Sequence, residues 1–203
     1  GPVADHDVAD LATLDAGAWF APEFAGEPVP TLDEILALVD GRAELCVEVK
    51  GGEAAHPGIT AATVAAIDRH AARPWCWLLS FHDGVLDSAA TLAPDLRCTK
   101  LAMGRLPGLG LSVDHRLRLG APWPARSIEA AAINRHLATG PWTDALHARG
   151  LEVWIWTLRD AAAHRQAIAH GADALITDDP VLARRILSRV DSPTPTPTPT
   201  PTP

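Results

Sequence analysis

The sequence contains few cysteines, and their arrangement excludes two common kinds of site. Only Cys46, Cys76 and Cys98 occur among the 203 residues. Their spacings match no zinc-binding or redox motif, and they suggest no disulfide framework. Because each of the three falls in a segment that we expect to be a strand, we predict three buried free thiols.

The sequence also lacks an excess of basic residues and a long apolar run. It has 17 basic and 25 acidic residues, with a formal net charge of −8, which argues against a nucleic-acid or anionic-membrane partner. A small phosphate-bearing substrate stays compatible, since it needs only one or two local cations. No run of about 18 apolar residues is present, so we expect no transmembrane helix.

A signal peptide is not recognisable either, and the chain starts at Gly1 instead of methionine. We therefore expect a fragment or a processed chain whose natural N-terminus lies outside the sequence. A cytoplasmic location is the simpler expectation, while secretion stays open for the same reason. The sequence does not indicate an oligomeric state.

The C-terminal end has a biased composition. From Ser192 to Pro203, proline and threonine alternate, and such a segment can neither bury apolar surface nor form a hydrogen-bonded ladder. We expect one domain over residues 1–190 and a disordered, dispensable Pro-Thr tail over residues 191–203.

Strand-like and helix-like segments alternate along the rest of the chain. Thr31 and Glu34 form a capping-box pattern, and Gly41 follows the helix that this pattern opens. Residues 104–123 are rich in glycine and proline and indicate a long loop. The expected strands are 45–50, 75–80, 97–102, 131–134, 153–157 and 174–177, and the other expected helices are 59–72, 84–93, 142–148, 160–170 and one from about 180.

Alternating strands and helices with short connections indicate an α/β fold with a parallel sheet. The absence of a Gly-x-Gly-x-x-Gly pattern after a first strand argues against a dinucleotide-binding fold. An open sheet and a TIM-type (βα)8 barrel remain, and a barrel typically has eight strands and about 250 residues. The six expected strands are reconciled with a barrel if its first two strands, about 60 residues, are missing.

In a barrel, functional side chains follow the C-terminal ends of the strands, and the first expected strand ends on Glu48-Val49-Lys50. Side chains alternate along a strand, so Glu48 and Lys50 share the face that would line the barrel. A carboxylate there can bind a divalent metal, and a lysine can contact a phosphate. A buried or rim ion pair between the two is the competing interpretation.

Other residues near strand ends have a structural interpretation beside a functional one. Trp156 fits the core as well as a site, Ser80 ends the second strand, and Asp178 is typical of a helix cap. His82 and His136 follow expected strands and are candidate site residues, each without a visible partner. We expect His6, His70, His164 and His170 to lie on polar or solvent-facing sides.

Three stretches of the sequence resemble glycerophosphodiester phosphodiesterases. The first is Leu14-Asp-Ala-Gly-Ala-Trp-Phe20, running into Val29-Pro-Thr-Leu-Asp-Glu34, and the second is the Glu-x-Lys segment Val47-Glu-Val-Lys50. The third includes Val153-Trp-Ile-Trp-Thr157 and Gly171-Ala-Asp-Ala-Leu-Ile-Thr-Asp178, and Ser80-Phe81 fits as well. The similarity extends over about residues 1–188.

This resemblance implies metal-dependent hydrolysis of glycerophosphodiesters, as in lipid and glycerol metabolism, to sn-glycerol 3-phosphate and an alcohol. It implies a divalent metal, calcium or magnesium, with Glu48 as one metal ligand. Lys50, Trp156 and Ser80 are then substrate-binding residues, and the partner is a small-molecule diester.

The family's His-Arg pair, Glu-x-Asp metal ligands and His-Asp step all precede the point that corresponds to Gly1. His6-Asp7 lies in a segment that resembles a variable part of the family, so we expect His6 not to be catalytic. We therefore expect no catalytic residue in this chain, and an inactive one. Two alternatives stay open: a non-catalytic barrel or binding module, and a phospholipase-type phosphodiesterase on the same fold.

Overall fold

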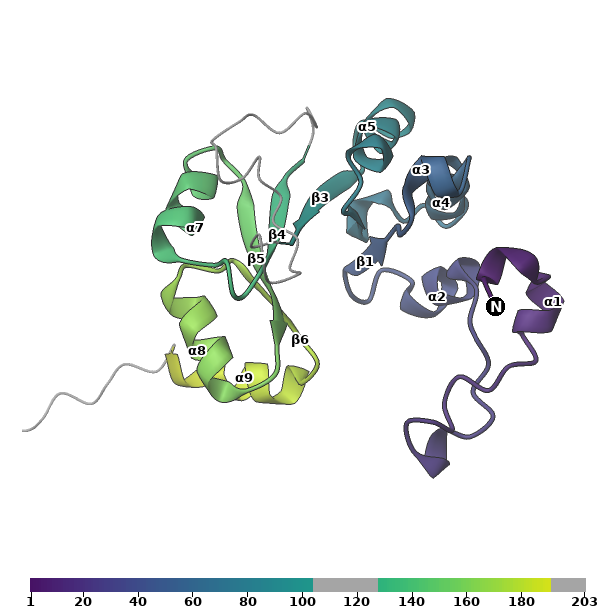
Figure 1. Cartoon of the computed structure of the whole chain (residues 1–203), viewed down its shortest axis with the longest axis horizontal. Coiled ribbons are helices and arrows are strands. Elements are labelled where there is room, and N and C mark those ends of the chain that lie inside the picture. Colours follow the sequence, from purple (N-terminus) through teal and green to yellow (C-terminus); the bar gives the residue numbers. More distant parts are fainter. Residues whose placement is uncertain (104–127, 191–203) are drawn as a thin grey trace, which may run out of the picture.

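A computed structural model describes residues 1–103 and 128–190, and Figure 1 shows their arrangement. A parallel sheet of six strands has the order β1-β2-β3-β4-β5-β6, so each strand lies beside its neighbour in the sequence. The strands are β1 (Leu45–Glu48), β2 (Cys76–Ser80), β3 (Arg97–Ala102), β4 (Ala130–Asn134), β5 (Glu152–Leu158) and β6 (Ala174–Thr177). The predicted parallel α/β architecture is confirmed.

Helices connect these strands and cover one face of the sheet. The helices are α1 (Val8–Leu11), α2 (Leu32–Val39), α3 (Gly52–Ala55), α4 (Ile59–Arg69), α5 (Asp83–Leu92), α7 (Gly140–His147), α8 (Ala161–Ala169) and α9 (Pro180–Val190). Short 3₁₀ turns lie at Val3–Asp5, Pro22–Phe24 and Arg73–Trp75. None of the helices in the two described ranges is long and apolar enough to cross a bilayer.

The helix-facing side of the sheet forms two apolar clusters. The first joins β1, β2 and β3 to α2, α4 and α5, with Ile67 and Leu78 fully buried. The second joins β4 and β5 to α7 and α8, with Ile133 and Ile155 fully buried. Burial of such side chains is the main favourable contribution to folding, so these clusters hold the helices on the outer face.

The opposite, inner face has its own cluster of buried side chains, and its geometry shows that the sheet is curled. The Trp77 ring on β2 and the Trp154 ring on β5 have centroids only 4.8 Å apart, although β3 and β4 lie between them. Strands three places apart in a flat sheet would be separated by about 14 Å. The sheet must therefore bend strongly, as in a barrel wall. The inner cluster contains Trp77, Leu79, Leu101, Ala130, Ala132 and Trp154.

Residues before α2 lie outside the sheet, and residues 15–26 among them are held together by one carboxylate. Asp15 accepts hydrogen bonds from the backbone N–H groups of Gly17, Ala18 and Gly26, which lowers the pKa of the Asp15 carboxyl. Helix α2 then begins with the predicted capping box: Thr31 accepts a bond from the Glu34 N–H, and the Glu34 carboxylate accepts one from the Thr31 N–H.

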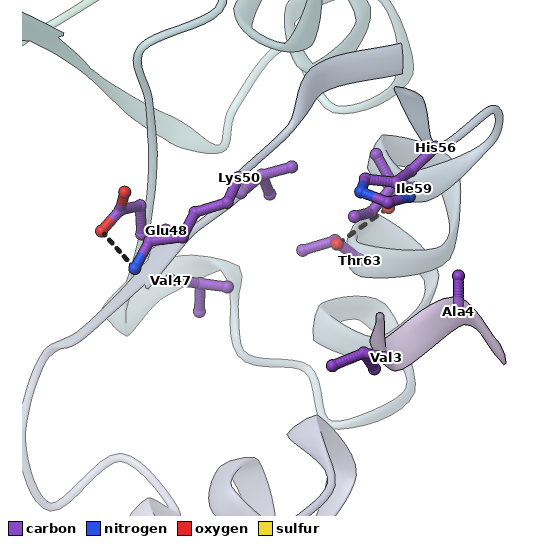
Figure 2. Close-up of a pocket in the computed structure, with 9 residues that line it drawn as sticks. Val3, Ala4, Val47, Glu48, Lys50, His56, Ile59 and Thr63 are labelled. Carbon is purple, nitrogen blue, oxygen red and sulfur yellow. Dashed lines mark hydrogen bonds and ion pairs between the residues drawn. The ribbon is translucent and has the colours of Figure 1, made fainter. Parts of the chain in front are cut away.

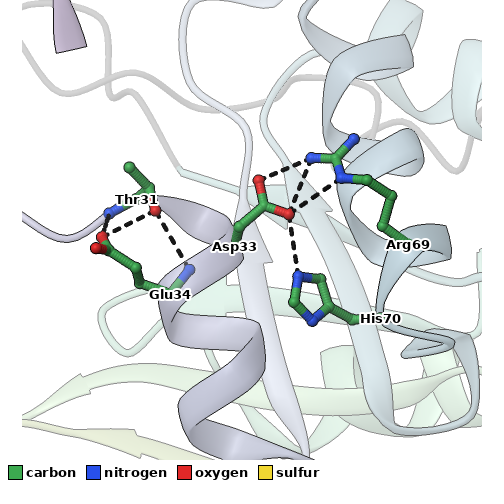
Figure 3. A network of polar contacts seen from close by, with 5 residues as sticks. All are labelled: Thr31, Asp33, Glu34, Arg69 and His70. Carbon is green, nitrogen blue, oxygen red and sulfur yellow. Dashed lines mark hydrogen bonds and ion pairs between the residues drawn. The ribbon is translucent and has the colours of Figure 1, made fainter.

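Figure 3 shows how α2 is fixed to α4 beyond this cap. The Asp33 carboxylate is bonded by the Arg69 guanidinium, with a shortest distance of 2.7 Å, and its Oδ1 lies 3.0 Å from His70 Nε2. These partners, Arg69 first, hold the pKa of Asp33 below its ordinary value. The contact orients the first turn of α2 against the end of α4.

Three sequence predictions need correction. Cys46 is exposed, whereas Cys76 and Cys98 are buried as expected. Cys46 lies on β1, which pairs only with β2 within the described residues, so one edge of β1 has no strand beside it. His164 is fully buried instead of solvent-facing: its Nδ1 lies 2.7 Å from the Asp160 carbonyl oxygen and its Nε2 lies 3.0 Å from Thr177 Oγ1.

The third correction concerns the start of α9. Asp178 is not its cap, because its carboxylate pairs with Arg159 at 2.9 Å. The next residue, Asp179, accepts a hydrogen bond from the Leu182 N–H at 2.9 Å and takes the capping role. The predicted loop over residues 104–123 and the predicted disorder of residues 191–203 concern segments outside the described residues.

Candidate active site

Glu48 and Lys50 lie where the sequence placed them, at the C-terminal end of β1. Glu48 is the last residue of the strand, and its Oε2 lies 3.7 Å from Lys50 Nζ. The Lys50 side chain is 79% exposed and that of Glu48 is 34% exposed. Val49 between them points the other way, into the outer cluster. A pair so exposed is a weak ion pair, so both side chains remain available to a ligand.

A pocket of about 430 Å³ lies between the helix-facing side of β1 and α4. Figure 2 shows the Glu48 carboxylate and the Lys50 ammonium meeting on the side turned away from His56, so their charged ends do not point into this pocket. The volume is within the usual range for a small-molecule site. The residues that line it are Val3, Ala4, Val47, Glu48, Val49, Lys50, His56, Ile59 and Thr63.

His56 was not singled out in the sequence, because it follows no predicted strand. Its position depends on Gly51, which has a φ of +80° and passes close to the imidazole. A Cβ on Gly51 would lie 2.6 Å from His56 Cδ2. The Gly51-Gly52 pair after Lys50 was the available signal, since a glycine in this conformation often marks a close backbone approach.

Trp156 lies on the inner face near the C-terminal end of β5, as its place in the alternation of this strand requires. Its indole Nε1–H donates to the Ala132 carbonyl at 3.0 Å, and its ring is partly buried. The Phe81 ring meets it edge-on, with centroids 5.9 Å apart. Phe81 follows β2, so the curl of the sheet brings these two strand ends together. The two rings form an aromatic wall on the inner side.

Ser80 has a different environment from the one its predicted role requires. Its hydroxyl is fully buried and donates to the Val49 carbonyl at 2.8 Å. It also accepts a bond from the His82 N–H at 3.1 Å. Ser80 shares the helix-facing side of β2 with Cys76 and Leu78, because side chains alternate. In this structure the hydroxyl joins the end of β2 to β1.

The two histidines noted after strands are separate from each other. His82 precedes α5 and helps line a second pocket of about 730 Å³, formed by residues 51–55 and 81–85. His136 follows β4, and its backbone N–H donates to the side-chain oxygen of Asn134 at 3.0 Å. His6 lies at the exposed N-terminus beside the first 3₁₀ turn.

Comparison with known proteins adds to this geometry. Residues 1–182 match the profile of the glycerophosphoryl diester phosphodiesterase family. The chain belongs to this family.

Relatives of the chain agree with this membership. A glycerophosphodiester phosphodiesterase from Caldanaerobacter subterraneus is 28% identical over 184 residues, which are 89% of this chain and 70% of that protein. A solved structure from Silicibacter pomeroyi has a TM-score of 0.70 at 26% identity and is matched over 82% of this chain and 58% of its own. The chain thus spans less than two thirds of that structure.

A third comparison supports the fold. The structure of an Oleispira antarctica phosphodiesterase in complex with the product sn-glycerol-3-phosphate has a TM-score of 0.74 at 23% identity. It is matched over 95% of this chain and 73% of its own. The curled six-stranded sheet is therefore part of the TIM-type barrel of the phosphodiesterase family.

A divalent metal needs several oxygen or nitrogen ligands, and Glu48 offers one carboxylate. In residues 1–103 and 128–190, no group of three or more histidine, cysteine, aspartate or glutamate side chains is placed to hold an ion. The described residues of this phosphodiesterase-family chain therefore do not fit a metal site by themselves.

Proposed function

We propose that the protein hydrolyses glycerophosphodiesters to sn-glycerol 3-phosphate and an alcohol. The observation that carries the proposal is the exposed Glu48–Lys50 pair at the C-terminal end of β1. This is the end of the sheet at which barrel enzymes act. Family membership supports the reaction class.

The Lys50 ammonium has the clearest role. Being 79% exposed and only 3.7 Å from one carboxylate, it can turn toward a phosphate without losing a buried partner. There it would donate to a phosphate oxygen and stabilise negative charge that grows during the reaction. The Phe81–Trp156 wall would contact the carbon atoms of the glycerol unit, since aromatic rings bury apolar surface well.

Glu48 is our proposed ligand for a calcium or magnesium ion, together with ligands outside the described residues. Because the described residues do not complete such a site, no step is assigned to the ion. We assign the proton transfers, which need a general acid and a general base, to the histidine pair that the family resemblance places before Gly1. Ser80 is left out of the substrate contacts, since its hydroxyl is bonded to backbone.

The first expected result follows from these assignments. The purified 203-residue chain should release no sn-glycerol 3-phosphate from glycerophosphocholine above the rate without protein, with or without calcium or magnesium. The assay is coupled detection of sn-glycerol 3-phosphate. Release that depends on added metal would show that this chain carries the catalytic residues after all.

The second test uses a form of the protein extended at its N-terminus by the segment with the histidine pair. Glu48→Gln should abolish its metal-dependent turnover, yet change the free energy of unfolding by about 1 kcal/mol or less, because the pair with Lys50 is exposed. Turnover and urea unfolding are measured on the same samples.

Glu152→Gln is the matched control. Glu152 lies at the opposite end of the inner face and bonds the Trp154 indole, so this variant should keep its turnover. A fully active but strongly destabilised Glu48→Gln protein would contradict the proposal and favour a structural pair. An extended protein with no turnover at all would favour the non-catalytic alternative.

A further inference from the structure

Lys100 is a buried lysine that the reaction as proposed does not use. It lies on β3 between Cys98 and Ala102, both of which belong to the clusters on the helix-facing side. Its side chain is only 3% exposed. Lysine is almost never buried without a partner, because removing an ammonium from water costs several kcal/mol. The location of its partners is therefore informative.

Two partners of Lys100 belong to the turn that joins β2 to α5. The ammonium donates to the Phe81 carbonyl at 2.7 Å and lies 2.8 Å from Asp83 Oδ1. Asp83 is the first residue of α5, where a carboxylate is also favoured by the helix dipole. One buried cation thus holds a backbone carbonyl and the start of a helix at the same time.

The other end of this turn is held by Ser80. Its hydroxyl donates to the Val49 carbonyl and accepts from the His82 N–H, as described above. Val49 stands between Glu48 and Lys50 in the sequence. The turn is therefore bonded to Val49, directly after β1, through Ser80, and to Lys100 on β3 through the Phe81 carbonyl and Asp83.

Fixing the Phe81 carbonyl also fixes the direction of its ring. A carbonyl held by a buried donor restricts the backbone dihedral angles of that residue and the next, and hence the direction of the side chain on Cα. The ring points to the inner side and meets Trp156 at 5.9 Å with an interplanar angle of 84°. Lys100 contacts the turn on the outer side of the sheet, whereas the Phe81 ring lies on the inner side.

We propose that Lys100 is a positioning residue of the candidate active site. Its ammonium holds the β2–α5 turn so that the Phe81 ring stays against Trp156, completing the aromatic wall for the glycerol unit. The part of this inference that concerns substrate rests on the proposed function. The positioning of Phe81 does not depend on it and can be tested alone.

Replacing the whole ion pair separates positioning from stability. A buried ion pair can often be exchanged for apolar residues without loss of stability, whereas removing one partner leaves an uncompensated charge. Asp83→Leu combined with Lys100→Met removes both charges and the donor to the Phe81 carbonyl. The double variant should melt within a few degrees of the wild type, but lose the nuclear Overhauser contact between the Phe81 and Trp156 rings in the 203-residue chain.

Two further variants calibrate this experiment. Asp83→Asn leaves the Lys100 bond to the Phe81 carbonyl in place and should keep the ring contact. Arg73→Met removes ion pairs to Asp68 and Asp95 near the opposite end of β2, and it should keep the contact as well. An unchanged contact in the double variant overturns the proposal. A double variant that does not fold overturns it too, because the pair would then serve the fold itself.

A titration with sn-glycerol 3-phosphate distinguishes this inference from the proposed function. Weaker binding by the double variant than by Arg73→Met supports both. Loss of the ring contact with unchanged binding supports the positioning role and contradicts the substrate wall. Retention of the ring contact contradicts the positioning role, whatever the affinity for sn-glycerol 3-phosphate.

Discussion

At the scale of single residues, the alternation of side chains along a strand decides which groups can meet a ligand. It places Glu48 and Lys50 on the side of β1 opposite Val49, as the sequence predicted. The same rule, applied to β2, places Ser80 on the helix side and its neighbour Phe81 on the inner side. The predicted substrate role of Ser80 came from family similarity alone, and strand alternation argues for Phe81 instead.

The reactivity of the three cysteines tests which strand side chains are covered by helices and which are exposed. At neutral pH, iodoacetamide should label Cys46 first, because it is exposed, whereas Cys76 and Cys98 are buried. Burial raises the pKa of Cys76 to about 11 and that of Cys98 to about 12, so both remain protonated and unreactive. Desolvation also raises the pKa of Cys46, so its labelling should be slower than that of a cysteine in a small, fully solvated peptide.

The measurement is a time course of alkylation followed by mass spectrometry of the intact chain. One adduct should form well before any second one, and Cys46→Ser should remove it. Equal labelling of all three cysteines would show that β2 and β3 are not covered by helices in solution.

At the scale of elements, local signals determined most helix and strand positions. The bounds of β3 and β6 agree with the prediction, and α2 has the predicted capping box. The turn of helix at α3 and the 3₁₀ turns were not predicted, because segments of three or four residues have no apolar periodicity. The buried His164 was missed because its partner Thr177 lies on β6, and a single sequence does not indicate that contact.

The contact between α2 and α4 predicts a response to acid. The Arg69 and His70 bonds lower the pKa of Asp33 from its ordinary value of 3.8. A carboxyl with a lowered folded-state pKa stabilises the fold above the unfolded pKa, and this contribution is lost as the pH falls through the lower, folded value. Asp33→Asn should therefore lose less stability than the wild type between neutral pH and pH values below about 3.8.

Urea unfolding at several pH values measures this difference. Both side chains are about half exposed, so the effect should shrink at high salt. Asp144→Asn, at an exposed position of α7, is the matched control and should follow the wild type. Identical pH dependence of Asp33→Asn and the wild type would contradict the role given to the Arg69 contact.

At the scale of the whole molecule, the features that a single sequence could not supply are contacts between distant strands. Trp77 meets Trp154, and Phe81 meets Trp156, each across two intervening strands. The parallel order of the sheet follows from alternating elements, but these distances depend on how strongly the sheet curls. The aromatic wall and the role of Lys100 therefore became visible only with the fold.

The sheet order also predicts where the fold opens first. In the described residues, β1 and β6 each have one neighbouring strand, whereas β2 to β5 have two. All residues of β2 are buried, but those of β1 and β6 are intermediate or exposed. Local opening costs least where few buried contacts are lost. Amide hydrogens of β1 and β6 should thus exchange at least about tenfold faster than those of β2, a difference of about 1.4 kcal/mol in opening free energy.

Hydrogen exchange of the 203-residue chain, read residue by residue by NMR, measures this gradient at two protein concentrations. An exposed strand edge can pair with another chain. If the β1 edge does so, protection at Leu45–Glu48 should rise with concentration, while protection at Cys76–Ser80 stays constant. Uniform protection across all six strands, independent of concentration, would contradict the open edges. Glu48 ends the β1 strand. Uniform protection would therefore also mean that the Glu48–Lys50 pair is held more rigidly than its exposure indicates.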